Sequence, residues 1–303
     1  MSSPVAKTLL IILGPTASGK TELAIRAAQW LDTEIISADS RQFYRELSIG
    51  TAKPSPEQLS AVRHHFIGHL SVTEDYNIAR FENDAIELLE VLFEKHDVVV
   101  MCGGSGLYID AVCHGIDEQP EHNPQIRKQL TEKYREKGIG YLQEQLQKLD
   151  PGYFNTVDIS NPQRLLRAVE VCLITGKPYS GYRKGELKDR SFRIVKIGLE
   201  ISREKLTERI NRRTDEMIGA GLVDEVKGLF SYRHLNALNT VGYKEIFCYL
   251  DGEWSLEEAT EKIKINTRRY AKRQMTWFRK DKTVTWIDPE LFSPVVLHEA
   301  LQR

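Results

Sequence analysis

The residues that most constrain this chain are Gly14–Thr21, which read Gly-Pro-Thr-Ala-Ser-Gly-Lys-Thr and match the phosphate-loop pattern G-x-x-x-x-G-K-[ST]. The apolar run before the loop, Thr8–Leu13, is typical of a buried strand, and Glu22–Trp30 after it favours helix. In this context, backbone N–H groups and the helix N-terminus face an anion. We expect Lys20 to reach a phosphate and Thr21 to offer its hydroxyl to Mg²⁺. The predicted phosphate-binding residues are Gly14, Pro15, Thr16, Ala17, Ser18, Gly19, Lys20 and Thr21.

The order of elements predicts an α/β fold, a P-loop NTPase-like parallel sheet with helices on both faces. Strand-like runs at Glu34–Ala38 and Val98–Cys102 enclose a helical pattern at Asn77–Lys95, and such alternation is typical of parallel sheets. Residues 121–176 read as helix instead, Lys177–Gly185 reads as a loop, and Phe192–Ile201 reads as a strand again. We therefore predict a catalytic core from residues 1–118 and 189–303, with an all-helical insertion domain at 119–188. The C-terminal part is predicted to be helical at Arg203–Leu229, Thr240–Leu250 and Leu256–Lys280.

Asp39 is the acidic residue best placed for chemistry. It follows the second predicted strand, and the carboxyl ends of neighbouring parallel strands lie at one edge of a sheet, where ligands bind. Many NTPases end a strand with a magnesium-binding Asp. Here Val98–Cys102 runs into Gly103 and Gly104 without an acid. Asp39 could bind magnesium or act as a base, and its structural alternative is a turn or a helix cap.

The charge of the chain is uneven. The net charge is −1, but residues 1–118 carry nine basic and 17 acidic side chains, and residues 119–188 carry 12 basic and eight acidic ones. Residues 262–282 hold nine basic side chains and one acidic one, a net charge of +8. A phosphate loop does not need this segment, so a polyanionic partner is expected. The alternative is an amphipathic helix whose basic face is only solvated, with Ile263, Thr267, Tyr270 and Met275 at core spacing.

Composition predicts a folded cytoplasmic protein. The four cysteines, at 102, 113, 172 and 248, have no metal-site spacing and suggest reduced thiols. No apolar run reaches membrane-spanning length, and the first residues lack a signal-peptide pattern. His64, His65 and His69 lie close in sequence, but no nearby Cys or second acid completes a metal site, so we expect structural roles for them.

Seven segments occur in an order that resembles bacterial tRNA dimethylallyltransferases (tRNA isopentenyltransferases), and the resemblance runs from Leu9 to about Asp288. They are Gly14–Thr21, Asp39–Gln42, Ile49–Pro54, Gly103–Tyr108, Asn161–Arg167, Val241–Tyr243 and Lys272–Trp277. Two departures are mild. Ser105 stands where the family often has Thr, and it keeps the hydroxyl group. Lys244 stands where Arg is common, and it keeps the positive charge but lacks the planar guanidinium group. We expect no zinc-finger tail of the kind found in many eukaryotic relatives.

The resemblance implies transfer of a dimethylallyl group from dimethylallyl diphosphate to N6 of adenine 37, next to the tRNA anticodon, with release of diphosphate. It implies that the loop binds the allylic diphosphate with Mg²⁺ rather than hydrolysing a nucleotide. By resemblance the catalytic residues are Lys20, Thr16, Arg213 and Asp39, where Asp39 takes the N6 proton. Arg209 lies one helical turn from Arg213.

The resemblance also assigns RNA contacts, and implies that the target adenine is extruded from the anticodon arm to reach the donor. We expect a monomer that binds tRNA and no membrane. The RNA-binding residues implied are Asp39, Ser40, Arg41, Gln42, Ser105, Arg127, Gln163, Arg164, Leu165, Leu166, Arg167, Lys272, Arg273, Gln274, Trp277 and Arg279.

Three other functions compete with this interpretation. A small-molecule kinase would share the sheet and loop but would leave the +8 segment unexplained. An adenylate isopentenyltransferase would perform the same chemistry on a free nucleotide and would not need the basic insertion. A non-enzymatic RNA-binding regulator is disfavoured by the intact Lys20, Thr21 and Asp39.

Overall fold

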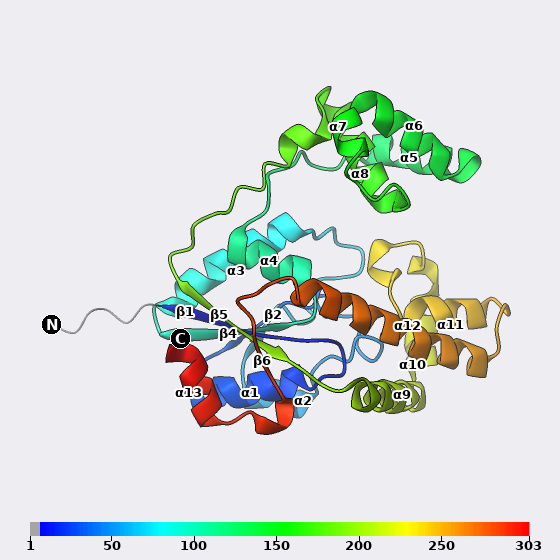
Figure 1. Ribbon diagram of the computed structural model, residues 1–303. Helices are drawn as coiled ribbons and strands as arrows, with labels where there is room; N and C mark the ends of the chain where they lie inside the picture. Colours follow the sequence, from blue (N-terminus) through cyan, green and yellow to red (C-terminus); the bar gives the residue numbers. More distant parts are fainter. Residues whose placement is uncertain (1–6, 303) are drawn as a thin grey trace. The chain divides into compact units, whose positions relative to one another are not determined.

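A six-stranded parallel sheet forms the centre of the larger of two compact units in the computed structural model, which describes residues 7–302 (Figure 1). The strand order is β3-β2-β4-β1-β5-β6, and the central β1 (Thr8–Leu13) pairs with β4 (Val98–Gly103) and β5 (Arg193–Leu199). The parallel sheet predicted from the sequence, including its return after the insertion, is confirmed. The remaining strands are β2 (Ile35–Ser37), β3 (His64–His65) and β6 (Thr285–Ile287).

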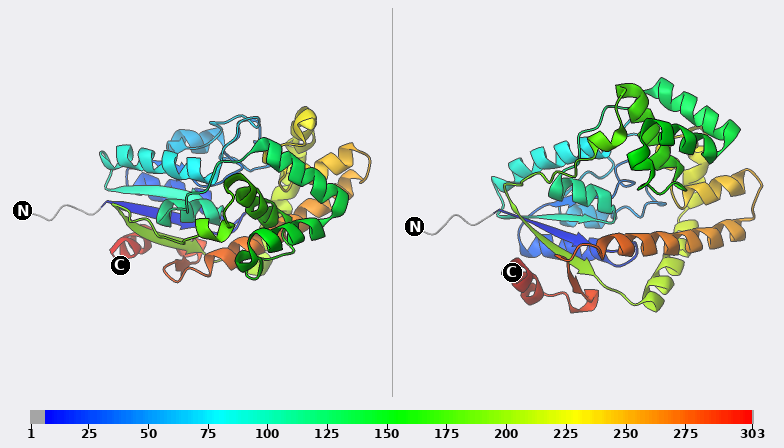
Figure 2. Two further views of the ribbon diagram at one scale, coloured as in Figure 1. Left: turned by 90° about the horizontal axis from the view of Figure 1, so that it is seen from above. Right: turned by 45° about the horizontal axis from the view of Figure 1, so that its top comes forward.

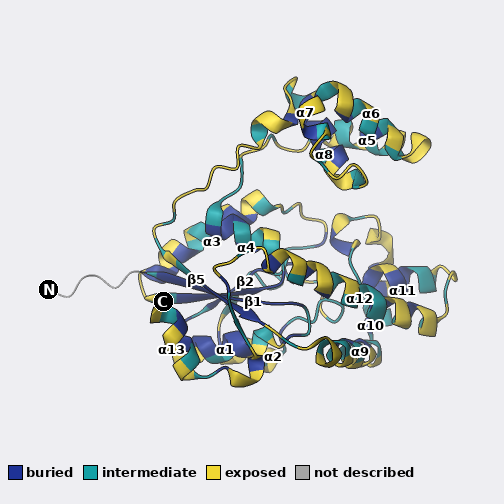
Figure 3. Cartoon of the chain, viewed as in Figure 1, coloured by how far each residue is buried: buried dark blue, intermediate teal, exposed yellow. Residues whose placement is uncertain are grey.

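Both faces of the sheet are covered by helices, as predicted. Side chains of a strand alternate between faces, so Leu9 and Ile11 of β1 join one core with α3 (Ile78–Phe93) and α4 (Gly106–His114). Leu10 and Ile12 join the other core, with α1 (Lys20–Trp30) and α13 (Pro294–Gln302). In the right view of Figure 2, α1 and α3 lie on opposite faces of the sheet. Burial on both sides is why β1 is apolar from Leu9 to Leu13, and Figure 3 shows the strand buried throughout.

The C-terminal helices build a third core around Tyr243 and Ile263. They are α9 (Arg203–Gly219), α10 (Leu222–Gly228), α11 (Tyr243–Leu250) and α12 (Leu256–Phe278). The remaining helix of the larger unit, the short α2 (Pro56–Ala61), is not part of this core. The single helix predicted at Arg203–Leu229 is wrong, because Gly221 adopts a left-handed backbone with φ of 98° and separates two helices. The sequence interpretation also missed β3, β6 and α13.

The smaller unit, residues 114–189, is helical and has its own core around Leu142, Leu146 and Val169. The predicted insertion began a few residues later, at 119. Asn123 and Asn161, each followed by proline, cap the two longest helices of this unit through their side chains. Its helices are α5 (Pro124–Lys137), α6 (Ile139–Leu149), α7 (Pro151–Phe154) and α8 (Pro162–Thr175). Across residues 7–302, no helix has the length and apolar character needed to cross a membrane.

Candidate active site

A cavity of about 360 Å³ opens where β1, β2 and β4 end. The phosphate loop after β1, Asp39 after β2 and the Cys102–Gly103 end of β4 all line it. Parallel strands present their carboxyl ends at one edge, and that edge is where open α/β sheets bind ligands. The structure therefore brings the predicted phosphate loop and the predicted carboxylate into one site. The other walls come from α9 and from a loop at residues 51–54.

The phosphate loop ends at Gly19, whose φ of 93° is a left-handed conformation that favours glycine, and α1 begins at Lys20. The Lys20 ammonium folds back and donates a hydrogen bond of 3.1 Å to the Pro15 carbonyl. Burial lowers the pKa of Lys20, the negative charge of Asp39 opposes this effect, and the positive charge of Arg213 reinforces it. Lys20 and Asp39 are therefore close enough for their charges to interact inside the cavity.

Two arginines of α9 reach the phosphate loop. Arg213 Nη2 donates to the Thr16 hydroxyl at 2.6 Å, and Arg209 Nη1 donates to the Ser18 carbonyl at 3.2 Å. Burial lowers the pKa of Arg213 from its ordinary value, and the charge of Asp39 opposes this effect. Both arginines line the cavity, one turn apart on the same helix. The structure thus joins Lys20, Arg209 and Arg213 into a cationic edge suited to a diphosphate.

Asp39 is held by the turn that follows β2. Its Oδ1 accepts a hydrogen bond of 3.1 Å from the Arg41 backbone N–H. The next residue is tied to the end of β4, because the Ser40 N–H donates to the Ser105 hydroxyl at 3.2 Å. Burial and the charge of Asp39 raise the pKa of Tyr270 to about 12, so this phenol remains neutral near the carboxylate. From its spacing alone, Tyr270 was predicted only to pack in the core.

The donor atoms of the cavity suit Mg²⁺. The Thr21 hydroxyl and the Asp39 carboxylate both line it, and Mg²⁺ at phosphate sites takes one or two protein oxygens together with substrate phosphates and water. Within residues 7–302, no group of three or more His, Cys, Asp or Glu side chains is arranged to hold a metal. Of the three clustered histidines, His65 pairs with Glu34, His69 packs against Phe43, and His64 lines the cavity.

Sequence reasoning missed how the loop at residues 48–54 is held. The Glu225 carboxylate of α10 accepts hydrogen bonds from the backbone N–H groups of Ser48, Ile49 and Gly50, at 2.7 to 3.1 Å, and from the Tyr243 hydroxyl at 2.6 Å. A Cβ on Gly50 would collide with the fully buried Tyr243 ring. The Ile49–Pro54 and Val241–Tyr243 motifs marked the two segments that meet here. Nothing in the sequence distinguished Glu225 from the other acidic residues of the C-terminal helices.

The +8 segment, residues 262–282, covers most of α12 and the turn after it, and it has one buried and one exposed side. Ile263, Thr267 and Phe278 are buried, while Lys272, Arg273 and Arg279 are exposed. Lys272 and Arg273 have no carboxylate within ion-pairing distance in the described part of the chain, whereas Arg279 pairs with Glu200 at 2.9 Å. Trp277 is 37% exposed, and its Nε1 donates to Asp110 at 2.9 Å.

Gln274 does not fit its predicted RNA contact. Its side chain is 6% exposed and points into the protein, where Oε1 accepts from the Thr16 N–H and Nε2 donates to the Gly104 carbonyl, each at 2.8 Å. Two other predicted contacts are partly occupied by the protein. The Gln42 amide donates to the Thr51 and Ala52 carbonyls, and Arg41 donates to the Asn236 and Ala237 carbonyls.

Some of the residues predicted to bind RNA in the smaller unit lie at its surface, and others lie in its helical core. Gln163 and Arg164 are exposed, and Arg127 and Arg167 are half-buried beside Glu170. Leu165 and Leu166 do not present their side chains at the surface, because both are buried in the helical core. On a helix, five consecutive residues cannot all face one side.

Comparison with known proteins decides the family. The IPP transferase model matches residues 42–281, most of the chain. The chain belongs to the IPP transferase family. It is 50% identical over 296 residues to tRNA dimethylallyltransferase 1 of Bacteroides thetaiotaomicron, covering 98% of this chain and 96% of that protein. It is 51% identical over 280 residues to tRNA dimethylallyltransferase of Christiangramia forsetii, covering 92% and 93%.

Solved IPP transferase structures have the same fold. The tRNA isopentenylpyrophosphate transferase of Bacillus halodurans matches with a TM-score of 0.69 and 37% identity, over 97% of this chain and 94% of that one. A eukaryotic dimethylallyltransferase acting on tRNA matches with a TM-score of 0.76 and 25% identity, over 93% and 74%. The resemblance noted from the seven motifs is therefore confirmed.

Proposed function

We propose that this protein transfers the dimethylallyl group of dimethylallyl diphosphate to N6 of adenine 37 in the anticodon arm of tRNA, with release of diphosphate. Membership of the IPP transferase family makes it a tRNA prenyltransferase. The observation that carries the mechanism is the meeting of Lys20, Arg213 and Asp39 in one cavity at the strand ends. Cations for a leaving diphosphate and a carboxylate for a proton are the two groups that this reaction requires.

The cationic edge assists departure of the diphosphate. As the C1–O bond of the allylic donor breaks, its electron pair goes to a diphosphate oxygen, where negative charge grows. Lys20 and Arg213 stabilise that charge at a position fixed by their bonds to the phosphate loop. Mg²⁺, held by Thr21 and the diphosphate, would supply further positive charge there.

Asp39 completes the transfer. The amine at N6 is a poor nucleophile, because its lone pair is delocalised into the adenine ring. The Asp39 carboxylate, oriented by the Arg41 N–H, accepts a hydrogen bond from this amine and takes its proton as the N6–C1 bond forms. A positioned base of this kind contributes about 10²–10⁴ in rate.

The basic surfaces support an RNA substrate rather than a free nucleotide. Lys272 and Arg273 are exposed and have no acidic partner in residues 7–302, and the smaller unit adds Arg164. An adenylate isopentenyltransferase or a small-molecule kinase has no need of them.

The test is to incubate the protein with unmodified tRNA and labelled dimethylallyl diphosphate, digest the RNA and identify the labelled nucleoside. We expect N6-dimethylallyladenosine, absent when adenine 37 is replaced by guanine. Labelling of AMP but not of tRNA would favour the adenylate enzyme, and robust hydrolysis of ATP without tRNA would favour the kinase.

A further inference from the structure

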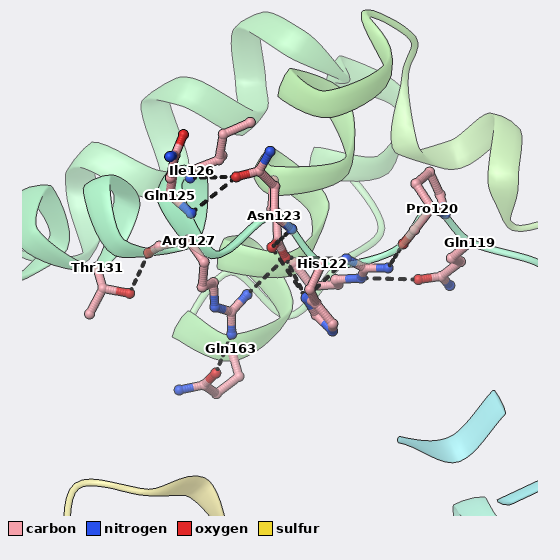
Figure 4. Close-up of polar contacts among 11 residues, drawn as sticks. Gln119, Pro120, His122, Asn123, Gln125, Ile126, Arg127, Thr131 and Gln163 are labelled. Atoms are coloured by element: carbon pink, nitrogen blue, oxygen red, sulfur yellow. Dashed lines mark hydrogen bonds and ion pairs between the residues drawn. The ribbon is translucent and has the colours of Figure 1, made fainter. Parts of the chain in front are cut away.

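Glu170 of α8 is a fully buried carboxylate at the edge of the smaller unit's helical core. It accepts hydrogen bonds from His122 Nδ1 at 2.9 Å, Arg167 Nη1 at 3.2 Å and Arg127 Nη1 at 3.3 Å. The Asn123 N–H adds a fourth bond at 3.3 Å. Figure 4 labels three of these donors, His122, Asn123 and Arg127, among the polar contacts of this unit. Three side chains from separate segments are thus held by a single acid.

The cluster keeps a positive charge. Burial opposes ionisation of Glu170, but the hydrogen bond and charge of His122, together with the two arginines, bring its pKa below the ordinary value. One carboxylate then faces two guanidinium groups, which leaves a net charge of at least +1. Such a charge at the surface attracts an anion, and guanidinium groups match phosphate geometry.

Each guanidinium group is also fixed from a second direction. Arg127 Nη2 donates to Gln163 Oε1 at 2.9 Å, a contact drawn in Figure 4. Arg167 Nη2 donates to the Pro120 carbonyl at 2.6 Å, and its Nε donates to Gln119. The two side chains nevertheless remain 30% and 19% exposed. Because they are already ordered, a ligand at their exposed edges does not have to immobilise them, which favours binding.

We propose that Glu170 is a positioning residue for tRNA binding, which holds Arg127 and Arg167, with His122, in the arrangement that receives one backbone phosphate. This inference rests on the proposed function, since it takes tRNA as the ligand. The family resemblance assigned RNA contact to the arginines but gave no role to Glu170 or His122. A purely structural role is the alternative, in which Glu170 only fastens residues 119–123 to α8.

The test is Glu170→Gln, which preserves size and removes the charge. The variant is more positive than the parent, so electrostatics alone predicts tighter tRNA binding. The proposal predicts the opposite, a tRNA Kd and KM raised about tenfold, with the rate at saturating tRNA retained. The slope of log K against log salt should become shallower by about 0.7–0.9, the effect of one lost phosphate contact.

Glu144→Gln is the matched control. Glu144 is exposed in the same unit and pairs with Lys148, so its substitution changes the charge equally without touching the cluster. It should leave the tRNA Kd unchanged or slightly lower. Adding Arg127→Gln to Glu170→Gln should weaken binding less than Arg127→Gln weakens it in the parent, because Glu170 acts through that arginine.

If Glu170→Gln does not fold, Arg127→Lys decides the question. Lysine keeps the charge but cannot reach Glu170 and Gln163 with one planar group, so the proposal predicts a Kd raised several-fold. Unchanged or tighter tRNA binding by a folded Glu170→Gln, or an unchanged Kd for Arg127→Lys, would overturn the proposal. Transfer by the parent tests the proposed function separately. A parent that binds tRNA without prenylating it would refute that function, while the binding comparison would still decide the role of Glu170.

Discussion

Gln274 of the basic helix α12 accepts a hydrogen bond of 2.8 Å from the backbone N–H of Thr16 in the phosphate loop. The same amide donates to the Gly104 carbonyl beyond β4, where a Cβ on Gly104 would collide with it. One side chain therefore joins the proposed tRNA-binding helix to the loop proposed to bind the donor. Substituting it should disturb the donor site from a helix that lies far away in sequence.

Gln274→Ala should destabilise the protein by about 1–3 kcal/mol, because two buried backbone groups lose their partner. It should also raise the KM for dimethylallyl diphosphate. Gln274→Glu keeps an acceptor for Thr16 but turns a buried carboxylate oxygen toward the Gly104 carbonyl, so it should destabilise the protein at least as much. Denaturant unfolding and donor-dependent kinetics measure both. A donor KM equal to that of the parent in a folded Gln274→Ala variant would show that the bridge is not needed.

The phosphate loop should be essential through Lys20 and Thr21. Lys20→Ala and Thr21→Ala should abolish transfer, whereas Thr21→Ser, which keeps the hydroxyl, should retain much of it. Chelation of divalent cations should stop the reaction, and added Mg²⁺ should restore it. Product formation in excess chelator would show that the reaction does not require Mg²⁺.

Lys272 and Arg273 should contribute to tRNA binding and not to donor binding. Substituting both by Gln should weaken tRNA binding most at low salt and make the salt slope shallower by roughly 0.7–0.9 per lost contact. Binding of dimethylallyl diphosphate alone should barely change. Lys95→Gln with Lys227→Gln, two exposed cations elsewhere in the larger unit, serves as the charge-matched control. Equal salt slopes for the two double variants would mean that the basic face of α12 is only solvated.

The loop anchored by Glu225 should be sensitive to that carboxylate. Glu225→Gln has one acceptor oxygen and two unwanted donors facing three backbone N–H groups and a phenol, so we expect a loss of about 1–3 kcal/mol in stability. Tyr243→Phe removes one of these donors and should cost less. Denaturant unfolding of the two variants provides the comparison, and equal losses would contradict this ranking.

The fold was largely predictable because its signals are local. The continuous apolar run of β1 implied burial on both faces, and the glycines around Lys20 implied a phosphate loop. Asp39 was found by its position after a strand, since parallel strands end at a common edge. The break at Gly221 was missed because glycine also occurs inside helices, and only its left-handed backbone separates α9 from α10.

Contacts between distant segments could not be predicted. Gln274 and Trp277 lie in the same basic segment, yet one is buried against the phosphate loop and the other is partly exposed. Likewise, Leu165 and Leu166 share a motif with Arg164 but face the helical core. A motif indicates that a segment matters, whereas the face that each residue presents depends on packing.

The most direct test of the central claim is the single-turnover rate of Asp39→Asn with tRNA and donor both bound. The account predicts a rate about 10²–10⁴ below that of the parent, with an unchanged tRNA Kd, because asparagine fills the same space but cannot take the N6 proton. A rate equal to that of the parent would contradict the account, since Asp39 would then be structural and another group would have to remove the proton.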